Sequence, residues 1–458
     1  MSELHVVVLA AGKGTRMKSA LPKVLHQASG LALIEHVIRT AQALSPASVV
    51  VVVGHQADSV RTALRERPDL RFAVQEPQLG TGHALLQAEP ALKNARGTLV
   101  LLSGDVPLLR ASTLEALIGT HRERQAAATV LTAVLDDARG YGRIVRENGR
   151  IAAIVEHKDA SPAQREIREM NSGIYAFDLG PLFAALRDIG SGNAQREYYL
   201  PDLVKIYRQR GLVVETVVAH DAAEVLGVNS RVELAEVSAI IKRQRNAALM
   251  ESGVTMIDPD SAFVGADVTI GADTVIYPDV YVEGRSTIGA NCVIYPGVRI
   301  ADSTIGDNVV INNACVISES NVRSGARLGP FAHIRPLSDV GENAHVGNFV
   351  ELKKTSLGAG SKANHLAYLG DATIGTKVNV GAGTITCNYD GTSKNPTVIE
   401  DGAFIGSDTQ LIAPVRVGKG AYVAAGSSIT EDVPPESLAI ARAKQVNKEG
   451  WVAKRKRK

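Results

Sequence analysis

Aromatic residues, cysteines and long apolar runs are all scarce in this chain of 458 residues. Phe, Trp and Tyr make up 4% of it against 42 glycines, which favours an aliphatic core with many tight turns. The three cysteines form neither an even set nor a C-x-x-C pair, which argues against a disulfide framework or a cysteine metal site. No run reaches the ~18 apolar residues of a membrane span. Because no signal-peptide pattern opens the sequence either, we expect a cytoplasmic protein.

An excess of one charge sign is also missing. The 50 Lys and Arg residues nearly balance the 48 Asp and Glu residues, and the net charge is +2. This balance gives no reason to expect nucleic acid or a membrane as a partner. The one strong charge run, KRKRK at 454–458, is interpreted as a solvated tail, with a phosphate-contacting arm as the alternative.

The first half alternates short apolar runs with amphipathic helical patterns. The runs are β-branched or Leu-rich and are bounded by Gly or charge. This alternation predicts a Rossmann-like α/β domain, whose mostly parallel sheet is covered on both faces and binds ligands beyond the carboxyl ends of its strands. Two later segments, 142–157 and 172–178, are interpreted as hairpins of an added substrate-binding flap. The predicted strands are 5–12, 48–54, 71–76 and 98–105, and the predicted helices include 33–44 and 59–68.

A different period follows a long helical pattern. Residues 231–250 predict one linker helix, with Asn229 and Ser230 as capping candidates. Aliphatic residues then recur every six positions from Val264 to Ile300, and the phase returns in 328–352 and 405–429. A hexapeptide period predicts a left-handed parallel β-helix, a triangular prism in which each coil buries the aliphatic face of its neighbour. The predicted domains are therefore 1–230, a linker at 231–251, and 252–458.

Two details of the prism follow from its phase. Cys292 and Cys315 fall at small inward positions, so we expect them in the core rather than as ligands. Between Val380 and Ile399 the phase is lost across Asn, Asp, Gly and Pro, which predicts a projecting loop.

The turn after the first strand, LAAGKGTRM (9–17), combines glycines with cations. It is neither a P-loop nor G-x-G-x-x-G, because Met17 takes the place of the third glycine. Gly12 and Gly14 allow close backbone approach, and Arg16 suits the pyrophosphate formed when a phosphate attacks a nucleoside triphosphate. Lys23 in LPKVL is expected near the same phosphates. A plain strand–turn–helix junction is the alternative.

Two further motifs favour the phosphate site. QLGTGHA (78–84) places Gly80, Thr81 and Gly82 at a tight turn before a helix. LLSGDVP (101–107) places Asp105 at the carboxyl end of a strand, where a carboxylate can bind Mg²⁺. A helix N-cap is the other interpretation of Asp105.

Polar and basic residues also gather in the prism, which an inert scaffold would not need. They are Arg335, Lys353, His365, Tyr368 and the Asn388–Tyr389 pair. At three hexads per coil, Arg335 and His365 should lie within a coil or two of each other. The cations could bind a sugar phosphate, and a neutral imidazole could take a proton from an attacking amine. A surface histidine, or a zinc site that includes His333 and His345, are the alternatives.

The ordered motifs resemble one family over nearly the whole chain. Ala10 and Ala11 match it better than the thymidylyltransferases, which usually have Gly-Gly there, whereas Ser103 replaces a Tyr of some members and should matter little. The motifs are LAAGKGTRM with LPKVL, QLGTGHA, GDVP, GYGRI, EHKDA, GVNSR, FAHIRP, HVGNFVELKK, KANHLAYLGD, GAGTITCNYDG, GSDTQL and AIAR. They resemble the bacterial bifunctional N-acetylglucosamine-1-phosphate uridylyltransferase/glucosamine-1-phosphate N-acetyltransferase.

The resemblance implies two reactions. Acetyl-CoA would acetylate glucosamine 1-phosphate, with His365 as general base. From the residues alone, Ser407 Oγ or a nearby backbone N–H could stabilise the oxyanion of this step. UTP would then react with N-acetylglucosamine 1-phosphate, with Mg²⁺ on Asp105 and Asn229 and with Arg16 and Lys23 at the phosphates. The implied nucleotide-sugar residues are Leu9, Ala10, Ala11, Gly12, Lys23, Gln75, Gly80, Thr81, Ser103, Gly104, Asp105, Gly142, Glu156, Asn171 and Asn229. Those for the amino-sugar phosphate are Arg335, Lys353, Tyr368 and Asn379, and those for acetyl-CoA are Ala382, Asn388, Tyr389, Ser407, Ala425 and Arg442.

The resemblance also implies a homotrimer in which each acetyl-transfer site is shared between subunits. Two other functions stay open from the residues alone. One is a sugar-nucleotide pyrophosphorylase whose β-helix serves only assembly or regulation, and the other is a non-catalytic scaffold that senses a nucleotide.

Overall fold

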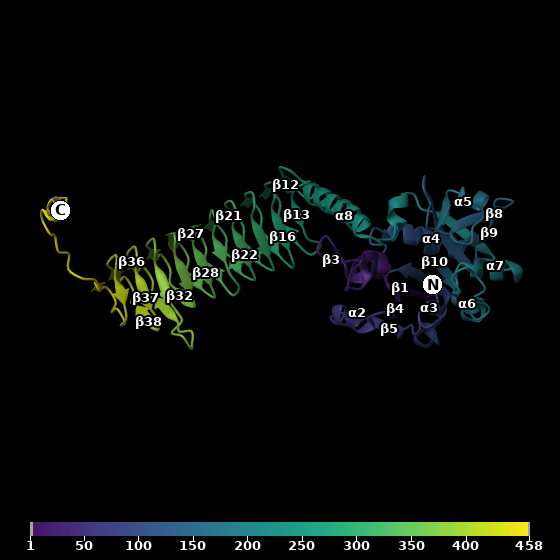
Figure 1. Cartoon of the computed structure of the whole chain (residues 1–458), viewed down its shortest axis with the longest axis horizontal. Coiled ribbons are helices and arrows are strands. Elements are labelled where there is room, and N and C mark those ends of the chain that lie inside the picture. The colour runs from purple at the N-terminus through teal and green to yellow at the C-terminus, as the bar shows by residue number, and fades with distance from the viewer. Residues whose placement is uncertain (1–2, 457–458) are drawn as a thin grey trace. The chain divides into compact units, whose positions relative to one another are not determined.

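The computed structural model describes residues 3–456 and divides into two compact units (Figure 1). The first unit ends at Ile241 and the second begins at Lys242, so the division falls within helix α8 (Arg231–Glu251). The predicted long helix is thus present. A capping box starts it, because Ser230 Oγ accepts from the Glu233 N–H at 3.2 Å and the Glu233 carboxylate accepts from the Ser230 N–H at 3.1 Å.

The first unit is built on a nine-stranded sheet. Its main path is β11-β7-β10-β6-β1-β4-β5, and β1 lies parallel to both β4 and β6. Along β1, Val6 and Val8 join one apolar core while Val7 joins the other. This two-sided burial is what helical crossovers on both faces produce, and the predicted fold class is confirmed. The strands are β1 (Leu4–Ala10), β4 (Ser48–Val53), β5 (Leu70–Val74), β6 (Thr98–Ser103), β7 (Ala128–Val134), β8 (Arg143–Glu147), β9 (Arg150–Val155), β10 (Glu169–Asp178) and β11 (Val214–Val218).

Helices cover both faces of this sheet. Those on the Val6 side contribute apolar residues to the same cluster as Val8, and those on the other side pack with Val7. The first group comprises α1 (Leu33–Gln42), α2 (Ala57–Ala63) and α4 (Ala111–Glu123), and the second comprises α3 (Thr81–Leu86), α6 (Leu179–Leu186) and α7 (Asp202–Gln209).

The segment 172–178 is not part of a flap, and that prediction was wrong. It lies within β10, which inserts antiparallel between β6 and β7 in the middle of the sheet. Its residues 174–177 are at most 2% exposed. After β7 the chain leaves the main path of the sheet, and it returns to that path as β10. A local apolar pattern does not reveal that a later segment pairs in the middle of the sheet. Segment 142–157 does form a hairpin, β8 with β9, and it joins β10 through the Met170–Arg143 pair.

The second unit is a parallel β-helix of the left-handed hexapeptide type. Up to β40, three sheets each take every third strand, and most residues stack on partners 17 or 18 positions along the chain. Pairs on either side of the loop between β34 and β35 are 25 positions apart. The aliphatic hexad residues fill the interior, and Cys292 and Cys315 are buried there as predicted. The strands used below are β25 (His333–Ile334), β27 (His345–Asn348), β28 (Glu351–Lys353), β30 (Lys362–His365), β31 (Tyr368–Gly370), β33 (Asn379–Val380), β34 (Ile385–Cys387) and β35 (Thr397–Ile399).

The predicted projecting loop lies between β34 and β35. Its residues 389–394 are exposed, and a bridge between Tyr389 and Lys394 closes it. Near the end of the chain, the short helix α9 (Trp451–Arg455) is exposed, and the Arg455 guanidinium stacks on Trp451 at 5.0 Å. The last two residues of the basic run lie outside the described residues. Within 3–456, no helix is long and apolar enough to cross a membrane.

Candidate functional site

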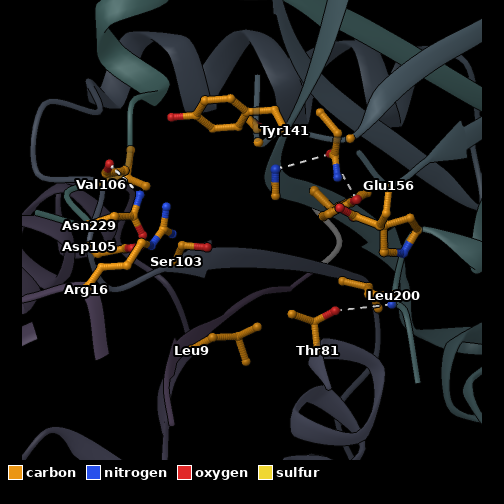
Figure 2. Close-up of a pocket in the computed structure, with 18 residues that line it drawn as sticks. Leu9, Arg16, Thr81, Ser103, Asp105, Val106, Tyr141, Glu156, Leu200 and Asn229 are labelled. Carbon is orange, nitrogen blue, oxygen red and sulfur yellow. Dashed lines mark hydrogen bonds between the residues drawn. The ribbon is translucent and has the colours of Figure 1, made fainter. Parts of the chain in front are cut away.

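A cavity of about 350 Å³ lies at the carboxyl ends of β1 and β6 in the first unit (Figure 2). Its walls come from the first turn, the start of α3, the segments on either side of the β8–β9 hairpin, β10, and the segments before α7 and α8. A cavity at this edge is where a parallel sheet is expected to bind a ligand. The predicted residues that line it are Leu9, Arg16, Thr81, Ser103, Asp105, Gly142, Glu156, Asn171 and Asn229.

Asp105 and Asn229 converge on one point although they are far apart in the sequence. The Lys23 ammonium donates to the Asp105 carboxylate and, at 3.1 Å, to Asn229 Oδ1. The Val228 N–H donates to the Asp105 carbonyl at 2.9 Å and fixes the two loops together. A carboxylate and an amide oxygen directed at a common point suit Mg²⁺, which takes few protein ligands beside phosphate oxygens. Asp105 does not cap a helix, because α4 starts after Arg110.

Glu233 fixes the backbone of Asn229. Its carboxylate accepts from the backbone N–H groups of Asn229, at 2.5 Å, and of Ser230. The capping box of α8 therefore also fixes the backbone that presents the Asn229 amide. Sequence reasoning missed this role, although the S-x-x-E pattern at 230–233 was present.

Arg16 faces the cavity from the 3₁₀ turn Thr15–Met17, which follows Gly14 at φ 57°. Its side chain is exposed, so the guanidinium is accessible to a phosphate. Tyr141, which the prediction omitted, stands on the opposite wall from Leu9 and Thr81 in Figure 2. Burial raises the pKa of the Tyr141 phenol, and the charge of Arg16 opposes this rise.

The other end of the cavity carries a carboxyl group and an amide, which can both bind hydroxyl groups. Burial, and then repulsion from Asp159, Asp202 and Glu197, raises the pKa of Glu156. Asn171 Oδ1 accepts from the Tyr175 hydroxyl at 2.9 Å, which fixes its amide. A carboxyl group and an oriented amide within one cavity can hold a sugar through paired hydrogen bonds.

Arg143 secures this end of the cavity from inside the fold. Its side chain is 1% exposed, and its guanidinium donates to the carbonyls of Tyr141, at 2.5 Å, and Arg165, at 3.3 Å. Two carbonyl partners compensate part of the cost of burying a cation. Arg143 thereby fixes the Tyr141–Gly142 turn.

The other predicted nucleotide residues do not line this cavity. Gln75 is buried and donates to the Gly80 carbonyl at 2.9 Å, and the Gly104 N–H donates to the Leu9 carbonyl at 2.9 Å. Gln75 and Gly104 therefore brace the turns beside the cavity. The predicted nucleotide residues that do not line it are Ala10, Ala11, Gly12, Lys23, Gln75, Gly80 and Gly104.

In the second unit, one edge of the prism carries the predicted imidazole and most of the predicted CoA residues. His365 ends β30, and its carbonyl accepts from the Gly383 N–H one coil later, at 3.4 Å. Two backbone hydrogen bonds and one from a side chain continue this column from coil to coil. Asp408 N–H donates to Ala382 (2.7 Å), Gly426 N–H to Ser407 (2.8 Å), and the Arg442 guanidinium to the Ala425 carbonyl (2.5 Å).

A cluster of charged residues lies on the adjacent face. Arg335 donates to Glu351 at 2.8 Å, and Glu351 stacks beside Tyr368 in the next coil. Asn388 donates to Asp371 at 2.5 Å. Lys353 lies 3.9 Å from the same Asp371 carboxylate. The structure thus brings together Arg335, Lys353, Tyr368 and Asn388.

Lys394 is a basic residue that sequence reasoning missed. It belongs to the projecting loop, and contact with the Lys353 ammonium lowers its pKa. Two ammonium groups at close range form a favourable site for a phosphate. The signal was available, because this lysine lies in the loop that interrupts the hexad phase.

Two predicted residues do not join that cluster. Asn379 starts β33 on the sheet that also carries His365, and Tyr389 is exposed in the projecting loop. The zinc alternative gains no support, because His333 and His365 belong to different sheets. Across the described residues, no three His, Cys, Asp or Glu side chains gather to hold a metal ion.

Comparisons with known proteins agree with both halves of the fold. Residues 6–169 match the MobA-like NTP transferase domain, 253–338 the GMPPB C-terminal domain, and 396–431 the bacterial transferase hexapeptide family. The chain is 52% identical over 459 residues to the bifunctional protein GlmU of Brevibacillus brevis, covering 100% of this chain and 99% of the relative. It is 51% identical to the bifunctional protein GlmU of an Exiguobacterium species, over 98% of this chain and 99% of the relative. The bifunctional protein GlmU of Shouchella clausii is 50% identical, over 99% of this chain and 100% of the relative.

Proposed function

The chain belongs to the family of bifunctional GlmU proteins, and on this premise we propose how its two units divide the synthesis of UDP-N-acetylglucosamine. The protein is a uridylyltransferase and an acetyltransferase. We assign uridylyl transfer to residues 1–230 and acetyl transfer to 252–458, joined by a linker helix at 231–251. The convergence of Lys23, Asp105 and Asn229 beside the cavity is the main support for the first assignment.

In uridylyl transfer, a phosphate oxygen of N-acetylglucosamine 1-phosphate attacks the α-phosphorus of UTP, and the bond to pyrophosphate breaks. Arg16 and Lys23 bind the phosphate oxygens, while Glu156 and Asn171 hold the sugar. Because the nucleophile is already an anion, positioning and charge neutralisation suffice without a covalent intermediate. Bound Mg²⁺, held by Asp105 and Asn229, would neutralise charge on the α-phosphate and the leaving group.

In acetyl transfer, the amine of glucosamine 1-phosphate attacks the thioester carbon of acetyl-CoA. His365 takes the proton from the amine, and Ser407 Oγ or a nearby backbone N–H stabilises the oxyanion. The carbon–sulfur bond then breaks and the thiolate of CoA leaves. The cations Arg335, Lys353 and Lys394 bind the sugar phosphate. The column from Ala382 to Arg442, with Asn388 and Tyr389, binds acetyl-CoA.

We further propose that the protein is a homotrimer with shared acetyl-transfer sites. Phe331, Phe349 and Leu366 form an apolar column beside His365 and are 51%, 55% and 63% exposed, and the two Phe rings stack at 5.2 Å. Such a column is expected to be covered by another subunit. Asn379 lies on a different face from the Arg335 cluster, which also fits a site completed by a neighbouring copy. A cytoplasmic location belongs to this proposal.

Two assays on one purified sample test the assignment. Pyrophosphate release is measured with UTP and N-acetylglucosamine 1-phosphate, and thiol release with acetyl-CoA and glucosamine 1-phosphate. Asp105→Ala should abolish the first and leave the second intact. His365→Ala should do the reverse, with acetyl transfer reduced ~10²–10⁴-fold. Pyrophosphate release without any thiol release from the wild-type protein would favour the pyrophosphorylase with a purely structural β-helix.

A further inference from the structure

Two neighbouring strands of the eleven-stranded sheet of the prism differ from the others. β27 and β30 each have four residues, whereas every other described strand of that sheet has two. The extension adds one further register pair at the carboxyl ends, Asn348 with His365. The longer strands therefore bring these two side chains together at the edge where His365 lies.

The backbone at this point tolerates only glycine between the paired positions. A Cβ on Gly347 would lie 1.9 Å from the carbonyl oxygen of Asn364, a distance that no side chain can adopt. Gly347 thus permits the close approach of the two strands immediately before Asn348. The sequence V-G-N at 346–348 encodes the extension.

The extension produces one hydrogen bond. His365 Nδ1 lies 2.7 Å from Asn348 Oδ1. An amide oxygen only accepts, so Nδ1 carries the hydrogen and, in the neutral ring, Nε2 keeps its lone pair. His365 is exposed, so packing does not fix its ring, and this hydrogen bond supplies the orientation.

Basic residues precede His365 on the two extended strands, since β27 begins with His345 and β30 with Lys362. His345 begins β27, and its pKa is lowered first by burial and then by Arg327, Lys362 and His365. An uncharged amide orients the imidazole without adding a negative charge that would favour its protonated form. A base that must be neutral before it acts benefits from such a partner.

We propose that Asn348 is a positioning residue that holds His365 in the tautomer whose Nε2 accepts the proton of the attacking amine. The proposal rests on the proposed function of His365 as the base. Asn348 acts only through His365 and does not bind the amino sugar.

The test uses the full-length protein and three variants. Asn348→Leu keeps the approximate size of the side chain but removes the acceptor. We expect kcat of acetyl transfer to fall ~10–100-fold, by analogy with the loss seen when the outer hydrogen-bond partner of a metal-bound histidine is removed. KM for glucosamine 1-phosphate and the rate of uridylyl transfer should stay unchanged. Asn348→Asp keeps an acceptor at this position, so this variant should retain most of the wild-type kcat. Its negative charge favours the protonated imidazole, so the acidic limb of the pH–rate profile should move to higher pH. Asn321→Ala, an exposed amide on another sheet, is the matched control and should leave both rates unchanged.

A double mutant separates this proposal from the proposed function. If Asn348 acts through His365, then Asn348→Leu should cause no further loss in a His365→Ala background. Normal acetyl transfer in Asn348→Leu, together with a strong loss in His365→Ala, would overturn the role of Asn348 and leave the base in place. Additive losses would also overturn it. Normal acetyl transfer in His365→Ala would instead remove the base and, with it, this inference.

Discussion

Gly370 gives a prediction whose size follows from the geometry of the acetyl-transfer site. It is the last residue of β31 and is buried between two proposed substrate-binding side chains. A Cβ placed there would lie 2.5 Å from the Tyr368 hydroxyl and 2.9 Å from Asn388 Nδ2. Both distances are too short for non-bonded contact, so Gly370→Ala must displace both groups.

The displacement sets the expected loss. A normal contact requires the Tyr368 hydroxyl to move by about 1 Å, and a misplacement of that size costs ~10²-fold in rate. We therefore expect kcat/KM of acetyl transfer for glucosamine 1-phosphate to fall ~10²-fold. Thiol release from acetyl-CoA measures it, and pyrophosphate release in the same sample should not change.

Two controls isolate the cause. Gly265→Ala lies in the same prism at a site where the nearest atom is 3.5 Å from the added carbon, so it should be silent. In a Tyr368→Ala background, Gly370→Ala should cost much less, because only the Asn388 contact remains. A Gly370→Ala protein with wild-type kcat and KM would refute the proposed crowding of Tyr368 and Asn388.

Three further predictions concern the first unit. Arg143→Met should destabilise the first unit by about 2–3 kcal/mol in a urea titration, because buried carbonyls lose a charged donor. The variant should also have a raised KM for the sugar phosphate. An unchanged midpoint and an unchanged KM would contradict this prediction. Since the pKa of Glu156 is raised in the fold, its contribution to stability is full below the ordinary Glu pKa and is lost as the pH rises through the raised value. Glu156→Gln should therefore melt higher than wild type at neutral pH but not in acid, and an equal difference at both pH values would exclude this explanation. Glu233→Gln should weaken Mn²⁺ binding, measured by electron paramagnetic resonance, because the backbone that presents Asn229 loses its charged acceptor. Unaltered Mn²⁺ affinity would show that the cap does not support the metal ligands.

The sequence alone determined the features that depend on local period and on residue type. Six-residue recurrence requires a prism with aliphatic hexads inside, so the burial of Cys292 and Cys315 followed directly. Apolar runs that end at Gly and Asp similarly placed Asp105 at the end of a buried strand. These predictions succeed because the cause and the effect lie within a few residues of each other.

Tertiary structure alone decided which distant residues share a site. Nothing local shows that β10 enters the middle of the first sheet, because its partners lie far away in the chain. Glu233 supports Asn229 only once α8 starts at Arg231, and Lys394 meets Lys353 only once the loop folds back over the prism. The contact of Asn348 with His365 depends on strand register across a 17-residue coil. Register and crossover are set by packing of the whole chain, and no short window of sequence contains them.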